Sequence, residues 1–212
     1  MAAIFKNRTE AGRALAKALL KYKGQNGLVL ALPRGGVPVG YAIAKALAMP
    51  LDILIVRKIG LPGHEEFGLG AMAETGAKVF DQKSISDFEV AQAEIDRVVA
   101  KESAELARRK LIYRGGRDLP NLSGRLVILT DDGLATGVTV RAAVAAAKEL
   151  GAAKIVVAVP VCARVPAKLI GPGIDEFVCL KSPVNFLAVG NWYEDFGEVS
   201  DAEVQQLLTG DF

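Results

Sequence analysis

The sequence has little of what disulfide-rich, membrane-spanning or strongly basic proteins need. Its two cysteines, Cys162 and Cys179, are too few for a disulfide framework or a zinc knuckle. No apolar run approaches the roughly 20 residues that cross a bilayer, and the first residues contain no apolar core of signal-peptide length. With 26 basic and 24 acidic residues, the net charge of +2 gives no electrostatic reason to expect duplex DNA or an anionic membrane as a partner. We therefore expect a soluble, cytoplasmic protein that binds neither nucleic acid nor membrane.

The apolar content is that of a packed protein. Hydrophobic residues make up 51% of the chain and charged residues 24%, which are the proportions of globular rather than disordered sequences. The chain has 212 residues and shows no internal repeat or obvious linker. We expect one domain over residues 1–212.

Amphipathic stretches alternate with short apolar runs along the chain. The expected strands are 28–32, 51–56, 125–130, 154–159 and 176–180. The expected helices are 9–22, one opened by Pro38, one running from a capping box at Ser86 and Glu89 to Gly115, 138–150, and one capped by Ser200. This alternation, with strands that are apolar throughout, predicts an α/β fold: a mostly parallel open sheet with helices on both faces.

Residues 59–76 interrupt this pattern. Repeated glycines and Pro62 break any regular periodicity there. The stretch is too long for an ordinary connection in a compact domain, and such segments are usually lids or binding loops. We expect a flexible active-site loop over about 59–76.

Ligands of open parallel sheets bind at the carboxyl ends of the strands, so the residues that leave each strand matter most. The segment that follows the expected strand 125–130 holds the acid pair Asp131-Asp132 and then residues 135–139, a turn between that strand and the next helix. Backbone N–H groups of that turn and the helix N-terminus can converge on a phosphate, and Gly137 permits a close approach. Carboxylates repel phosphate, so the acid pair suits a neighbouring sugar diol or Mg²⁺. An isolated Asp-Asp would more often be a helix cap.

Residues 126–139, Leu-Val-Ile-Leu-Thr-Asp-Asp-Gly-Leu-Ala-Thr-Gly-Val-Thr, resemble the phosphoribosyl-pyrophosphate signature of the type I phosphoribosyltransferases. Thr130 and Gly133 replace aliphatic residues of the commonest form, and Val138 replaces a frequent glycine. The resemblance continues in chain order. Pro33-Arg34-Gly35-Gly36 falls at the family's pyrophosphate loop, which often has a strained or cis peptide, and Arg57-Lys58 falls at its basic pair. Taken alone, the first is also an adequate strand-to-helix turn and the second an adequate solvated strand end.

The resemblance implies Mg²⁺-dependent transfer of ribose 5-phosphate from phosphoribosyl pyrophosphate to a nitrogen acceptor, a nucleobase or related heterocycle, with release of pyrophosphate. Asp131 and Asp132 would hold the ribose hydroxyls, and Mg²⁺ would be held mainly by the donor, with no direct protein ligand. The implied donor-binding residues are Arg34, Gly35, Gly36, Arg57, Lys58, Ala135, Thr136, Gly137, Val138 and Thr139. Residues 181–212 would form a small hood, and a homodimer is possible because family members are often dimers.

The acceptor is the open part of this interpretation. Oxopurine-specific members carry an acidic residue where this chain has Ala135, so a proton-handling group would have to come from the loop, with Glu66 first and Glu65 or His64 behind it. Candidates to stack on the acceptor ring are Phe186, Trp192 and Tyr193, which could equally pack beneath the last helix. The alternative function is a non-catalytic regulator of the same fold that binds phosphoribosyl pyrophosphate or a nucleotide. A kinase-like protein is disfavoured by the lack of a Gly-Lys-Ser/Thr motif.

Overall fold

The computed structural model describes residues 4–164 and 173–210, without the side chains of Glu65 and Glu66. Its main sheet has five parallel strands in the order β2-β1-β6-β7-β8. These strands are β1 (Gly27–Ala31), β2 (Leu51–Ile53), β6 (Leu126–Thr130), β7 (Lys154–Val161) and β8 (Glu176–Lys181). Every residue of β1 and β6 is buried, as expected for strands covered on both faces. The predicted α/β fold with a mostly parallel sheet is confirmed.

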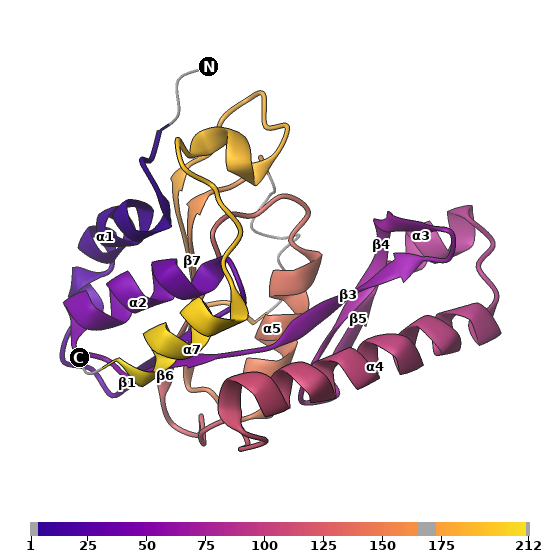
Figure 1. Ribbon diagram of the computed structural model, residues 1–212, viewed down its shortest axis with the longest axis horizontal. Helices are drawn as coiled ribbons and strands as arrows, with labels where there is room; N and C mark the ends of the chain where they lie inside the picture. The colour runs from indigo at the N-terminus through magenta and orange to yellow at the C-terminus, as the bar shows by residue number, and fades with distance from the viewer. Residues whose placement is uncertain (1–3, 165–172, 211–212) are drawn as a thin grey trace.

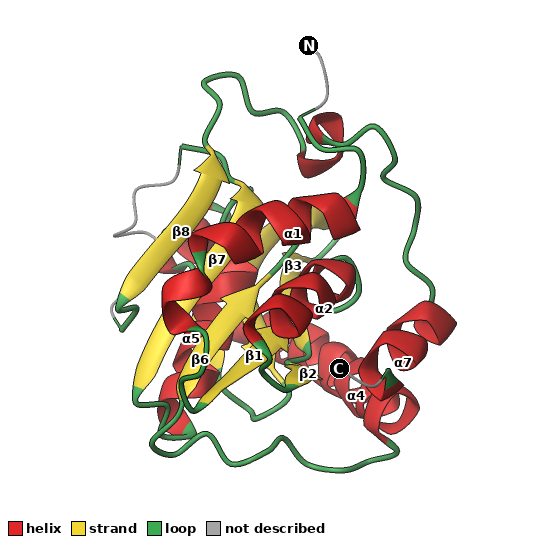
Figure 2. Ribbon diagram, turned by 90° about the vertical axis from the view of Figure 1, so that its left-hand side faces the viewer, coloured by secondary structure: helices red, strands yellow, loops and turns green. Residues whose placement is uncertain are grey.

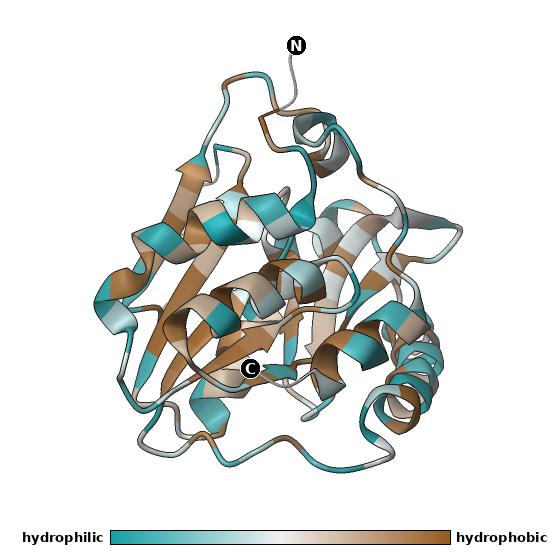
Figure 3. Cartoon of the chain, turned by 60° about the vertical axis from the view of Figure 1, so that its left-hand side comes forward, coloured by the Kyte–Doolittle hydropathy of each residue, from teal (hydrophilic) through white to brown (hydrophobic). Residues whose placement is uncertain are grey.

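Helices cover both faces of this sheet (Figure 2). On one face, α1 (Arg8–Ala18) and α2 (Gly36–Leu47) pack their apolar sides onto alternate residues of β1, β6 and β7. On the other face, α5 (Val138–Glu149) packs on the intervening residues of the same strands. Figure 3 shows the strands of the main sheet largely in brown, hydrophobic colours, and the helices around them in a mixture of teal and brown.

The segment between β2 and β6 builds a second, antiparallel sheet rather than a loop. It consists of β3 (Val56–Leu61), β4 (His64–Ala73) and β5 (Lys78–Phe80), in that order across the sheet. Figure 1 shows it reaching away from the main sheet, with α3 (Gln82–Asp87) at its tip and α4 (Gln92–Arg114) along its side.

Two sequence expectations are corrected here. The prediction of an irregular loop at 59–76 is wrong, because this stretch forms β3 and most of β4, with Ile59 and Leu69 buried in one hydrophobic cluster and Ala71 in another. Gly70 is needed there, since a Cβ would collide with the Val79 carbonyl of β5. The single strand at 51–56 is also wrong, because β2 ends at Ile53 and the chain enters the second sheet at Val56.

Several helix boundaries also differ from expectation. The first helix ends at Ala18 and continues as the 3-10 turn η1 (Leu20–Tyr22). Helix α2 starts at Gly36, so Pro38 is its third residue, still within the first turn that tolerates proline. Ser86 and Glu89 form no capping box, and α4 begins at Gln92.

Two predicted helix ends are confirmed. Gly115 terminates α4 in the left-handed conformation, with φ of 58°. The Ser200 side chain accepts a hydrogen bond from the Glu203 N–H at the start of α7 (Asp201–Thr209).

The chain after β8 crosses the top of the main sheet. The 3-10 turn η2 (Val189–Trp192) lies beside the N-terminal strand bridge between Phe5 and Tyr193, and the chain then descends to α7, which packs against α2 and α4. Among the residues that the structure describes, no helix combines the length and the apolar character needed to span a bilayer.

Candidate functional site

The site lies where β1 and β6 end side by side. Ala31 and Thr130 are partners in the parallel register, so the segments 33–36 and 131–139 leave the sheet at the same edge. Strand β1 continues through α2 to β2 on one side, and β6 continues through α5 to β7 on the other. This is the switch point at which open parallel sheets bind their ligands.

Two helices begin at this edge without a side-chain cap. Gly35 precedes α2 and Gly137 precedes α5, and neither position provides a side chain that accepts a hydrogen bond from the first N–H groups. Gly137 has φ of 78°, a conformation that favours glycine. Uncapped N–H groups and the positive end of the helix dipole attract anions. The turn that contains Ala135 and Thr136, which are both exposed, is therefore a ready anion cradle.

The acid pair is mostly buried between these two helix starts. The Asp131 carboxylate accepts a hydrogen bond from the Asp132 N–H at 2.8 Å. Burial first, and the neighbouring Asp132 charge second, raise the pKa of Asp131 well above its usual value, although Lys58 opposes the shift. Burial also raises the pKa of Asp132, against the effect of the Arg8 side chain. A pair held in this way favours a ligand that brings positive charge or hydroxyl donors to it.

The predicted glycines of the first segment pack directly on this pair. A Cβ at Gly35 would overlap the Asp132 carboxylate, and a Cβ at Gly36 would lie 2.9 Å from the Cα of Asp131. The peptide between Pro33 and Arg34 is cis. Glycine at 35 and 36 is thus required by close approach to the acidic segment.

Arg8 is a site residue that the sequence did not reveal. Its Nε donates to the Asp132 carboxylate at 2.8 Å, and a terminal nitrogen donates to the Gly197 carbonyl at 2.7 Å. The guanidinium also lies over the Phe196 ring, 3.8 Å from its centroid. Arg8 lies in the first turn of α1, more than a hundred residues from its partner, and no local motif marks it.

The predicted basic pair is divided by the alternation of a strand. Arg57 and Lys58 are neighbours in β3, so their side chains leave on opposite faces. Lys58 reaches the loop after β6 and lines a cavity of about 200 Å³ with Asp131, Asp132 and residues 133–137. Arg57 turns toward α4 and donates to the buried Glu102 carboxylate at 2.6 Å.

A second cavity, of about 400 Å³, adjoins the first and shares three residues with it: Lys58, Asp131 and Thr139. Pro33 and residues 56–58 form one wall of this second cavity. Helix α4 forms the other wall, with Lys101, Glu102 and Arg109. The structure thus brings together the predicted Arg57, Lys58, Asp131 and the 135–139 turn, and adds α4, which carried no recognisable signal.

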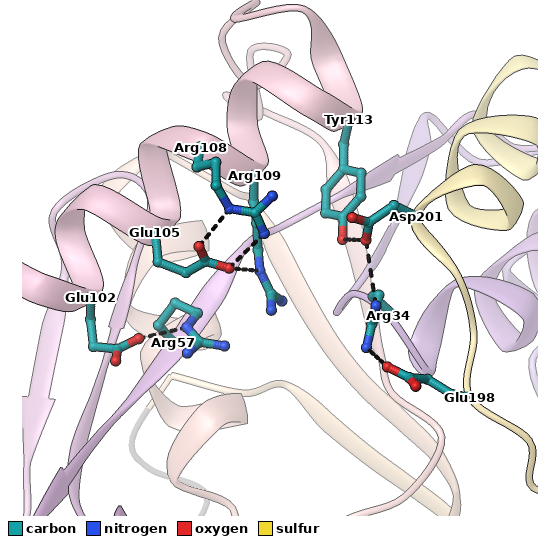
Figure 4. A network of polar contacts seen from close by, with 9 residues as sticks. All are labelled: Arg34, Arg57, Glu102, Glu105, Arg108, Arg109, Tyr113, Glu198 and Asp201. Atoms are coloured by element: carbon teal, nitrogen blue, oxygen red, sulfur yellow. Dashed lines mark hydrogen bonds and ion pairs between the residues drawn. The ribbon is translucent and has the colours of Figure 1, made fainter.

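The Arg34 side chain is directed elsewhere. It pairs with Glu198 and lies 3.6 Å from Asp201, whose carboxylate also accepts the Tyr113 hydroxyl at 2.6 Å (Figure 4). Arg34 is not among the residues that line either cavity. In this conformation two carboxylates of the C-terminal segment hold its guanidinium away from both cavities, and its role in donor binding stays a prediction.

Two of the three predicted stacking aromatics are buried in the core. Trp192 and Tyr193 are each 5% exposed and pack with Phe5, and the Tyr193 hydroxyl donates to the Asp132 carbonyl at 2.5 Å. Burial raises the pKa of Tyr193 further above its usual value. Phe186, which is half-buried, stacks on Trp192 with centroids 6.3 Å apart. Tyr193 therefore supports the acid segment through Asp132, and the burial of both rings leaves neither with a free face for an acceptor.

Packing also explains one departure from the usual signature. A Cβ at Gly133 would lie 2.5 Å from the Val189 side chain of η2, so an aliphatic residue has no room there. Val138 is the first residue of α5 and Thr139 lines both cavities. Glu66 lies in β4, but its side chain is outside the described part of the structure.

Comparison with known proteins agrees with this geometry. The model of the "Phosphoribosyl transferase domain" family matches residues 2–192. Two curated Mycobacterium tuberculosis proteins, of strains CDC 1551 and H37Rv, are each 43% identical over 206 residues; the second is named "Putative phosphoribosyl transferase Rv0571c". The match covers 97% of this chain but only 46% of those proteins, so the chain spans about half of their length.

A solved structure extends the agreement to three dimensions. The crystal structure of TT1426 from Thermus thermophilus superposes with a TM-score of 0.80 at 39% identity, covering 96% of this chain and 97% of that one. The family match covers the strand ends, the glycine loop and the acid segment described above. The chain therefore belongs to the phosphoribosyl transferase domain family.

Proposed function

We propose that the chain binds phosphoribosyl pyrophosphate at the edge formed by β1 and β6 and transfers its ribose 5-phosphate to a nitrogen acceptor, a nucleobase or a related heterocycle. The observation that carries this proposal is the shared cavity wall: Lys58, Asp131 and the turn before α5 face one space. In this arrangement the N–H groups of 135–139 hold the 5-phosphate, and the carboxylates of Asp131 and Asp132 accept hydrogen bonds from the ribose hydroxyls.

The reaction separates charge in a way that this site suits. The bond from C1 of the sugar to pyrophosphate breaks, its electron pair leaves with the pyrophosphate, and the acceptor nitrogen forms the new bond. Positive charge that develops on the sugar is offset by the acid pair, and negative charge on the leaving group by Lys58 and Arg57. The acceptor nitrogen loses its proton to a base.

Phosphoribosyl pyrophosphate is bound together with Mg²⁺ in this family, and the residues at the site fit this ion. Two adjacent carboxylates supply hard oxygen atoms, and because burial raises the pKa of both, a cation beside them would stabilise their ionised forms. In our proposal the pyrophosphate oxygens hold most of the coordination sphere, with Asp131 and Asp132 close by. The ion, when bound, neutralises the leaving group.

The test is a titration followed by a turnover screen. Isothermal titration with phosphoribosyl pyrophosphate and Mg²⁺ measures donor binding, and pyrophosphate release is then assayed across free bases and related heterocycles. We expect binding by the wild-type chain and release with at least one acceptor. The Asp131→Asn, Asp132→Asn double variant should lose both while keeping its circular dichroism spectrum. Donor binding without release on any acceptor would favour the regulator, and no donor binding would overturn the proposal.

A further inference from the structure

Helix α4 forms a cationic wall that faces the basic residues of β3. The 400 Å³ cavity between them is lined by four positive side chains, two from each element: Arg57 and Lys58 of β3, and Lys101 and Arg109 of α4. Figure 4 shows Arg57 rising from the strand and Arg109 descending from the helix toward it. The negative residues on the cavity wall are Glu102 and Asp131.

The charge of this cavity is positive even before ligand binding is considered. Glu102 is committed to Arg57 at 2.6 Å. Basic residues on the cavity wall thus outnumber acidic ones, four to two, and a partly enclosed cavity strengthens their field. A ligand with several negative charges in a small volume fits this arrangement.

We propose that α4 supplies the second half of the leaving-group site, with Arg109 and Lys101 binding the pyrophosphate moiety opposite Arg57, while Lys58, on the other face of β3, lies between this space and the acid pair. This rests on the proposed function, because the cavity is continuous with the acid pair through Lys58 and Asp131. A diphosphate attached to a sugar at the acid pair extends into this space and meets positive charge on both sides.

Glu105 holds Arg109 in place for this role. It accepts from Arg109 at 2.8 Å and from Arg108 at 2.7 and 2.9 Å. These bonds lower the pKa of Glu105 to about 2, so the carboxylate remains ionised and both pairs persist at neutral pH. The two arginines thus share one anchor, yet of the two only Arg109 lines the 400 Å³ cavity. Arg108 lines an adjoining hollow that shares Arg57, Lys101 and Glu102 with it.

That difference provides a matched control. We would measure binding of magnesium pyrophosphate to the full chain by isothermal titration for wild type, Arg109→Ala, Lys101→Ala and Arg108→Ala. Loss of a charge-assisted hydrogen bond to phosphate should weaken binding about tenfold or more in Arg109→Ala, with a smaller loss in Arg109→Lys. Lys101→Ala should weaken binding in the same direction, and Arg108→Ala should match the wild type. Thermal melts check that each variant is folded.

The outcomes separate this inference from the proposed function. If wild type binds magnesium pyrophosphate and Arg109→Ala binds it equally well, the role of α4 is overturned while the donor site stands. If Arg108→Ala loses as much as Arg109→Ala, the effect belongs to the general field of the helix, and the assigned contact is wrong. If the wild type binds neither pyrophosphate nor the donor, the proposed function itself fails.

Discussion

At the scale of single residues, Asp131 shows a conflict between stability and ligand binding. Its pKa is raised by burial and by Asp132, so the folded chain holds a proton that the unfolded chain releases at lower pH. The free energy of unfolding therefore falls as the pH rises from the unfolded pKa toward the folded one, by about 1.4 kcal/mol for each pH unit that separates the two. A ligand that offsets the repulsion between the Asp131 and Asp132 carboxylates therefore restores the free energy of unfolding that their ionisation removes.

The Asp131→Asn variant should be more stable than the wild type but unable to bind the donor. We expect its melting temperature to exceed that of the wild type at pH 7. The difference should shrink as the pH approaches 4, because the wild-type carboxyl is then protonated and uncharged, like the asparagine. Thermal melts across this pH range measure the effect. Parallel curves for the two proteins would show that Asp131 is not destabilised in the folded state. Donor binding should be lost in the same variant.

Glu66 is the residue-scale candidate for handling the acceptor proton. If it does so in the transition state, Glu66→Gln should slow turnover by roughly 10²-fold or more. Glu65→Gln, at its neighbour in β4, tests the second candidate in the same way. Steady-state rates of pyrophosphate release measure both, and a loss of only about twofold in Glu66→Gln would remove it from this role.

At the scale of elements, the antiparallel sheet and α4 behave as one unit joined by a buried ion pair. Arg114, near the C-terminal end of α4, is 4% exposed and pairs with Glu74, whose side chain is 5% exposed, on the turn after β4. Burial lowers the pKa of Arg114. The pair ties the C-terminal end of α4 to the turn after β4.

Breaking this pair from one side should be costly. Glu74→Leu leaves Arg114 buried with only the more distant Asp52 carboxylate, 4.0 Å away, and should lower the free energy of unfolding by about 3–5 kcal/mol. The Glu74→Leu, Arg114→Met double variant should recover most of that loss, since it buries no unpaired charge. Urea unfolding of the two single variants and the double variant forms a complete cycle. Additive losses would show that the two residues are not coupled.

The elements also show where sequence reasoning succeeds and where it stops. Strands β1 and β6 are buried along their whole length, and the turn that ends at Gly137 lies in the loop between β6 and α5, so local patterns suffice for both. The hairpin of β3 and β4 was not predicted, because the glycines of residues 59–76 indicated a loop more strongly than the alternation of Ile59 and Leu61 indicated a strand. Long-range pairing, such as that of Arg57 with Glu102, depends on how α4 docks, and no local signal encodes it.

At the scale of the whole molecule, ligand binding should be visible as stability. A ligand that binds only the folded state stabilises it by RT ln(1 + [L]/Kd), about 2.7 kcal/mol at a hundredfold excess over Kd. Phosphoribosyl pyrophosphate with Mg²⁺ should therefore raise the melting temperature by several degrees. Removing Mg²⁺ with a chelator should reduce the shift, and the Asp131→Asn, Asp132→Asn double variant should show none. An equal shift in that variant would place the donor elsewhere.

The near balance of total charge hides a strongly uneven distribution. A net charge of +2 gave no hint of an anion site, yet cations from two separate elements surround one cavity. The sequence predicted two of these cations, Arg57 and Lys58, because both residues directly follow an expected strand. Arg109 and Lys101 lie among the many alternating charges of α4, where a solvated helix surface is the more general interpretation.

The contact between Arg8 and Asp132 has a practical consequence for anyone who re-engineers the ends of this chain. Trimming the first ten residues would leave every recognisable motif intact and yet strip the second acid of its counter-ion. An inactive truncated preparation would then reflect the missing arginine, and shortened versions should be judged only with that side chain retained.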